Sequence, residues 1–211
     1  MAGKRGDTFL NMMLFIELFT LNRAWEGLTD DELFWEPFVG SWGIRARGEC
    51  RTAAPFGDGD WVVDFDADLA AAADHGRAIE PLPTIGWLLW HVGSQPGRLA
   101  ELDFLGGTKT APSGWTSPYL THHPVFTTAR EAVESMRDGW RALDRALRAS
   151  SDEQLEQTTS FWSYGGQPAL PAFGAQVIAL TLNEISHHGT QICMLRDLYA
   201  AAGGCTLSAS T

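Results

Sequence analysis

Positive charge and cysteine are both scarce in this chain of 211 residues. Lysine and arginine number 15 against 26 aspartates and glutamates, which gives a formal net charge of −11. Nucleic-acid binding needs clustered cationic side chains that displace counterions, so we expect no DNA or RNA partner. The three cysteines, Cys50, Cys193 and Cys205, are odd in number and lack C-x-x-C spacing. We expect them to be free thiols in a reducing cytoplasm.

Long apolar runs are absent as well. Lys4 and Arg5 precede the apolar run 12–19, as in a signal peptide, but Glu17 interrupts that run and no small-residue cleavage site follows. No other apolar stretch reaches the roughly 18 residues that span a bilayer. We therefore expect a cytoplasmic protein with no membrane partner.

What the chain does have is enough apolar residues for a sizeable core. Hydrophobic residues make up 45% of the sequence and charged residues only 19%. A chain of this length and composition fits one domain, which we place over residues 1–211. Helical periodicity recurs along it, so we expect an all-α helical bundle.

Three segments show the spacing of amphipathic helices. The first, 8–25, has an apolar stripe formed by Leu10, Leu14, Leu18, Leu21 and Trp25. The second, 83–105, contains Pro96, which predicts a kink. The third, 127–149, has an apolar seam with heptad spacing, formed by Val133, Met136, Trp140, Leu143 and Leu147.

Helical periodicity disappears between residues 40 and 83. Gly, Pro and Asp are frequent there, and the short apolar piece 61–65 follows the turn residues 57–59. We predict that 40–83 is an insertion containing a small β-hairpin or an irregular excursion. Residues 203–211 are expected to form a disordered tail.

A fourth helical segment, from about residue 172 to 202, has a stripe with apolar ends and a polar centre. Its members are Val177, Thr181, Glu184, His188, Gln191, Leu195 and Leu198. Burying a carboxylate and an imidazole costs several kcal/mol unless each has a partner, and one cation between them supplies it. Glu184 and His188 lie one turn apart, so both can bind the same ion.

A third metal ligand is expected from another helix, and His91 is the only histidine inside another predicted helix. Each part of this triad also has a structural interpretation: a lone histidine is commonly a core residue, and Glu-x3-His is commonly a surface ion pair. His187 offers an alternative, because with Glu184 it makes the Glu-x-x-His element of di-iron bundles. Such sites need a second element of this kind, which the sequence lacks. We therefore predict one metal ion bound by His91, Glu184 and His188.

Two motifs give the chain a resemblance to the DinB/YfiT-like superfamily. They are LLWHV at 88–92 and NEISHHGTQ at 183–191. The segments LTDDELFWEP at 28–37 and LRDLY at 195–199 are also similar to actinobacterial members. The resemblance extends from about Leu10 to Tyr199.

The resemblance implies a DinB-like four-helix bundle, with the insertion between its first and second long helices. It also implies a divalent metal, usually zinc or nickel, held by three side chains with one face open. Many members use three histidines; here Glu184 replaces one, as in the mycothiol-dependent maleylpyruvate isomerase branch. Zinc is the favoured metal. Members often form homodimers, so a second copy of the chain is a candidate partner.

The implied activity is a metal- and thiol-dependent S-transfer or isomerisation of a small electrophile, with mycothiol or a similar thiol as cosubstrate. Trp87, Trp115 and Tyr119 are candidates for the apolar part of the pocket, and Arg98 for contact with an anionic group. Each of these four has an equally good packing or surface interpretation. Two other functions stay open: a metal-dependent hydrolase, and a non-catalytic bundle that binds a metal or small molecule.

Overall fold

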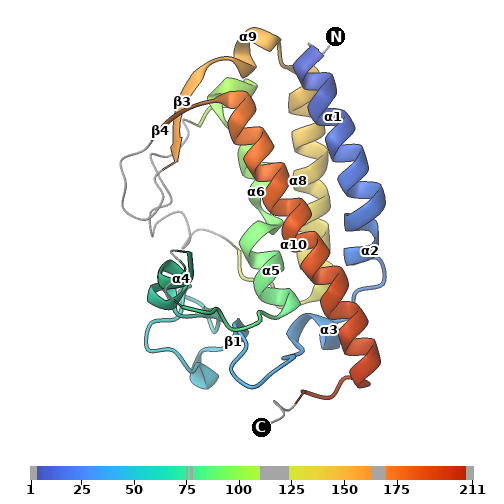
Figure 1. The fold of residues 1–211 in the computed structure, drawn as a ribbon, viewed down its shortest axis with the longest axis vertical. Helices are drawn as coiled ribbons and strands as arrows, with labels where there is room; N and C mark the ends of the chain where they lie inside the picture. The colour runs from blue at the N-terminus through green and yellow to red at the C-terminus, as the bar shows by residue number, and fades with distance from the viewer. Residues whose placement is uncertain (1–3, 75, 77, 110–123, 163–169, 208–211) are drawn as a thin grey trace.

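A bundle of long helices forms the body of the protein in the computed structural model, which describes residues 4–74, 76, 78–109, 124–162 and 170–207. The bundle helices are α1 (Lys4–Ile16), α5 (Ile85–Gly93), α6 (Gln95–Ala100), α8 (Ala129–Ala149) and α10 (Gly174–Ala202). In Figure 1, α10 crosses the front, α8 lies behind it, α1 runs along one side, and α5 and α6 run along the other. The predicted helical bundle is confirmed.

The first predicted helix contains one wide turn that changes its buried face. α1 continues through a π-helical turn, η1 (Glu17–Leu21), into α2 (Asn22–Trp25). The buried stripe is Phe9, Met13, Ile16, Leu21 and Trp25, with a spacing of five residues across the wide turn.

The predicted stripe of this helix was therefore wrong in its N-terminal half. Leu14 and Leu18 are 52% and 56% exposed. The extra residue in the π-helical turn changes which residues before it lie on the buried face of the helix. Large apolar side chains also occupy the exposed side, at Met12, Phe15 and Phe19, so hydrophobic spacing does not distinguish the two faces.

The second predicted helix is divided into α5 and α6, and its end lies earlier than expected. The Thr84 hydroxyl caps α5 by accepting the backbone N–H of Trp87 at 3.2 Å. The break falls at Ser94, two residues before Pro96, in agreement with the predicted kink. α6 ends at Ala100, and a short 3₁₀ turn, η3 (Asp103–Leu105), follows.

α8 and α10 match their predicted extents closely. Every member of the heptad seam of α8 is buried, and α8 packs against α6 through a close contact of Gly97 with Gly139. α10 begins at Gly174, two residues later than predicted. Its C-terminal half is tied to α3 (Asp30–Phe34), because Arg196 donates to the Glu32 carboxylate at 2.8 Å.

The predicted hairpin in the insertion is confirmed as β1 (Gly43–Ala46) paired antiparallel with β2 (Trp61–Asp64). The insertion also contains a 3₁₀ turn, η2 (Arg47–Glu49), and α4 (Ala67–Asp74). The buried Arg45 guanidinium joins the hairpin to the preceding segment, because it lies 3.0 Å from Asp64 and 2.9 Å from Glu36.

A second hairpin, β3 (Thr158–Trp162) with β4 (Leu170–Phe173), precedes α10 and was not expected from the sequence. The short helix α9 (Asp152–Leu155) leads into it. After α10 the chain folds back, and the Leu207 N–H donates to the Pro37 carbonyl at 2.9 Å. Residues 203–207, which were expected to belong to a disordered tail, thus fold back onto the segment that precedes the insertion. Among the described residues, no helix has the length and apolar character needed to cross a membrane.

Two leucines in the wide turn test its register. Leu21 is 2% exposed and Leu18 is 56% exposed. We expect Leu21→Ala to lower the free energy of unfolding by about 2–5 kcal/mol, because it leaves a cavity, and Leu18→Ala to change it by less than about 0.5 kcal/mol. Urea denaturation measures both. Equal losses would contradict the five-residue spacing.

Candidate metal centre

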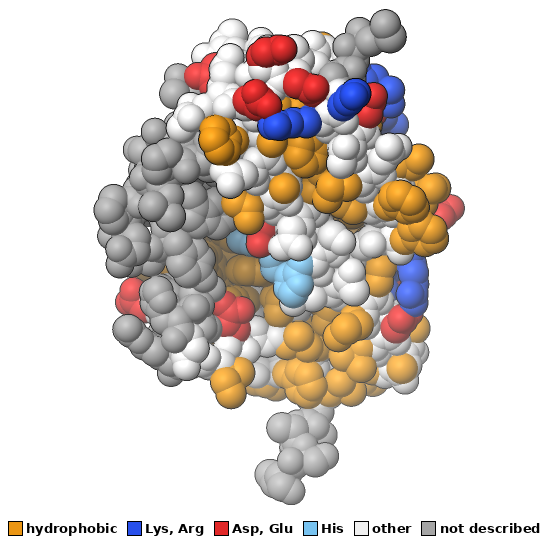
Figure 2. Space-filling view, turned by 45° about the horizontal axis from the view of Figure 1, so that its top comes forward, with side chains coloured by type: hydrophobic (Ala, Val, Ile, Leu, Met, Phe, Trp, Pro, Cys, Tyr) orange, Lys and Arg blue, Asp and Glu red, His pale blue; other side chains and the backbone are white. Residues whose placement is uncertain are grey.

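α5 and α10 bring the three predicted ligands together. One ligand atom each of His91, Glu184 and His188 lies within 4.8 Å of the other two, and all three residues are partly exposed. His91 comes from the last turn of α5, whereas Glu184 and His188 come from adjacent turns of α10. Figure 2 shows histidine side chains beside an acidic side chain and a recess with apolar walls. The site is therefore reachable from solvent.

The separations fit a single small cation. His188 Nε2 lies 3.3 Å from Glu184 Oε2, and two ligand atoms of a tetrahedral zinc ion are about 3.4 Å apart. The rings of His91 and His188 meet edge to face, with centroids 4.9 Å apart at 90°. Two imidazole nitrogens and one carboxylate oxygen are a donor set that zinc and nickel accept.

The surroundings of His91 keep its ring neutral. Burial, with a smaller contribution from His188, lowers the pKa of His91 to about 4. The Trp87 indole covers the ring in a stacked arrangement, with centroids 5.1 Å apart at 15°. A neutral imidazole is the form that binds a metal, so no proton has to leave His91 at neutral pH.

The two α10 ligands face solvent unequally. The side chain of Glu184 is 34% exposed and that of His188 is 13% exposed. The adjacent His188 imidazole lowers the pKa of Glu184, although burial opposes this. On the other side of the His188 ring, Nδ1 lies 2.7 Å from Gln191 Oε1. The carboxylate is thus ionised and held against the imidazole.

The remaining histidine of the motif, His187, is exposed on α10. Its ring touches that of His188, with centroids 4.8 Å apart, but it is not among the residues that converge on the site. Of the two neighbouring histidines, His188 is the one that converges with His91 and Glu184.

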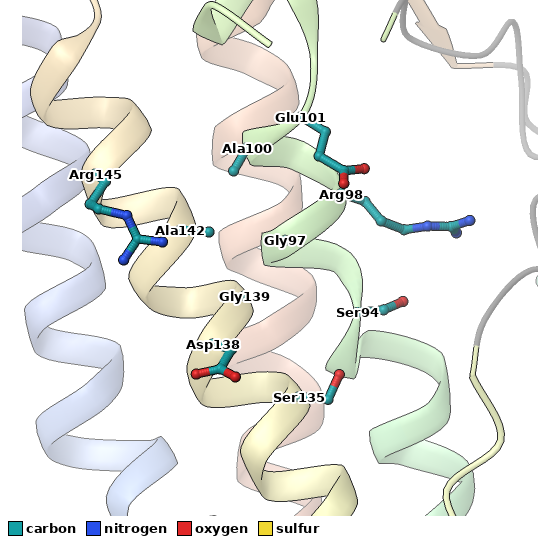
Figure 3. Close-up of a pocket in the computed structure, with 10 residues that line it drawn as sticks. All are labelled: Ser94, Gly97, Arg98, Ala100, Glu101, Ser135, Asp138, Gly139, Ala142 and Arg145. Carbon is teal, nitrogen blue, oxygen red and sulfur yellow. The ribbon is translucent and has the colours of Figure 1, made fainter. Parts of the chain in front are cut away.

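The four residues proposed for substrate contacts fall in different places. Trp87 is buried beside His91, where it also packs on Trp42 of the insertion. Arg98 lines an open cavity of about 440 Å³ between α6 and α8, and none of the candidate ligands lines that cavity. In Figure 3 the guanidinium of Arg98 points away from the side chains of α8. Trp115 and Tyr119 lie outside the described residues.

Sequence reasoning missed the aromatic cluster that supports the site from the insertion. Phe65 packs on both Trp87 and Trp90, with ring centroids 5.8 Å and 5.6 Å away. The Trp87 indole therefore lies between the insertion and His91. The aromatic residues of 40–65 were a signal for this contact, but their partner lies more than twenty residues further along the chain.

These features define a helical-bundle protein with a candidate site for one divalent metal. The family model of the DinB superfamily matches residues 20–192. The chain belongs to this superfamily, in agreement with the resemblance in its motifs. Neither curated proteins nor solved structures gave a match.

The metal content of the purified protein tests the site directly. After incubation with zinc and desalting, we expect about one equivalent of metal per chain, and much less in His91→Ala, Glu184→Ala and His188→Ala. His187→Ala is the matched control, because it removes an adjacent exposed imidazole and should leave the metal content unchanged. Elemental analysis gives the result. Less than about a tenth of an equivalent in the unaltered protein would exclude the site.

Proposed function

We propose that the protein is a metal-dependent enzyme in which a low-molecular-weight thiol, of the mycothiol type, reacts with a small electrophile. The reaction is an S-transfer or a thiol-assisted isomerisation. The observation that carries this proposal is the convergence of His91, Glu184 and His188 at a place open to solvent on one side. A metal with three protein ligands and an open position is the arrangement of catalytic zinc sites, whereas structural sites are closed.

A divalent cation bound there would act as a Lewis acid that lowers the pKa of a coordinated thiol or water. The protein residues set the charge of the site. Two neutral imidazoles and one carboxylate leave a net charge of about +1 with a divalent ion. That residual charge favours an anionic thiolate. Zinc is the proposed metal, with nickel as the alternative.

The walls of the site suit a small, partly apolar substrate. Trp87 is 8% exposed and Trp90 is 1% exposed, and both belong to the aromatic cluster beside His91. Apolar walls exclude water from that side of the site, which protects a thiolate from solvation and strengthens its attraction to the metal. We propose that the electrophile approaches from the open side, next to Glu184.

Thiol-dependent turnover tests this proposal. We expect zinc-loaded protein to accelerate the reaction of monochlorobimane with mycothiol above the spontaneous rate. In the His188→Ala variant we expect the acceleration to be about 100-fold smaller, because a ligand of the activating metal is missing. Fluorescence of the thioether product measures the rate, and His187→Ala again serves as the matched control.

Two other experimental results would contradict the proposed thiol-dependent activity. Ester hydrolysis that needs the metal but no thiol would replace the proposed activity with the hydrolase alternative, in which water takes the open position. Stoichiometric metal binding without turnover of either substrate class would contradict an enzymatic function and favour a binding bundle.

A further inference from the structure

Gln191, like Thr181, is a polar residue of the α10 stripe that is not one of the candidate metal ligands. It is partly exposed, and it lies one turn after His188, so both side chains are on the same face of the helix. We propose that Gln191 is a positioning residue that fixes the hydrogen of His188 on Nδ1 and directs Nε2 to the metal. This inference rests on the proposed metal site.

The proposal follows from counting donors and acceptors around one imidazole. Gln191 Oε1 is 2.7 Å from His188 Nδ1, and a carbonyl oxygen only accepts hydrogen bonds, so Nδ1 carries a hydrogen. Glu184 Oε2 is 3.3 Å from His188 Nε2, and an ionised carboxylate also only accepts. A neutral imidazole has one hydrogen for these two acceptors. The contact with Gln191 is the shorter of the two, so it takes the hydrogen, and Nε2 is left free to share a cation with Glu184 Oε2.

Both hydrogen-bond acceptors around the His188 ring come from α10 itself. Glu184 precedes His188 by four residues and Gln191 follows it by three, so the ring is held from both sides by one rigid helix. The turn before His188 contributes the candidate ligand oxygen of Glu184, and the turn after it contributes the hydrogen-bond acceptor of Gln191. His91 then completes the site from α5. Partners of this kind, behind a metal-binding histidine, set its tautomer and raise its basicity.

Two substitutions of Gln191 distinguish the effect of its hydrogen-bond acceptor from the effect of its size. Gln191→Leu removes the acceptor at similar size, and we expect it to weaken zinc binding about 10- to 100-fold. Gln191→Glu keeps an oxygen for Nδ1 and should bind zinc at least as tightly as the unaltered protein. Thr190→Ala is the control, because Thr190 is exposed and its hydroxyl bonds the Ser186 carbonyl. Competition with a chromophoric chelator measures the affinities.

The tautomer itself gives a readout that needs no metal. Long-range ¹H–¹⁵N correlations of ¹⁵N-histidine-labelled protein, assigned with His188→Ala, report which ring nitrogen carries hydrogen. We expect hydrogen on Nδ1 of His188 in metal-free protein and a loss of this preference in Gln191→Leu. An Nδ1 without hydrogen would overturn the inference, since the amide would then donate from its NH₂ group.

The outcomes distinguish this inference from the proposed metal site. If the unaltered protein binds zinc and Gln191→Leu binds it equally tightly, Gln191 has no positioning role and the metal site stands. If the unaltered protein binds no zinc, the metal site fails, and the tautomer measurement still decides whether Gln191 orients His188.

Discussion

The packing of α5 against α10 is the contact on which the candidate site depends. α10 is apolar on its inner face toward both ends, where Val177 and Leu195 are 0% and 2% exposed, but carries Glu184 and His188 between them. Placing ionisable groups in such a face costs several kcal/mol each unless they are paired. The bundle reduces this cost by leaving the site open to solvent on one side and by bringing His91 to it from α5.

The insertion supports the same contact from outside the bundle. Its hairpin is anchored by the buried Arg45, which pairs with Asp64 and Glu36, and its aromatic side chains pack on Trp87 and Trp90. The insertion therefore supports the aromatic side chains of α5 that lie beside His91.

The convergence of three side chains could be predicted more fully than the fold around them. Glu184 and His188 lie on an uninterrupted α-helix, where spacing alone defines the face, and His91 was the only histidine in another helical segment. The stripe on the first helix was misassigned at Leu14 and Leu18 because hydrophobic spacing assumes regular α-helical turns. The β3–β4 hairpin was missed because its strands are short, and the packing of Phe65 on Trp87 is a tertiary contact that no local pattern encodes.

The wide turn at Glu17–Leu21 shows how the first long helix tolerates an irregular step in its buried face. Ile16 and Leu21 are five residues apart on one buried face, whereas every other step of that face, from Phe9 to Trp25, is three or four. Taking one residue out of the turn would convert the five-residue step to four and leave the same five side chains in the core. The π-helical turn thus accommodates one residue more than a regular helix while the buried side chains on both sides of it stay on one face.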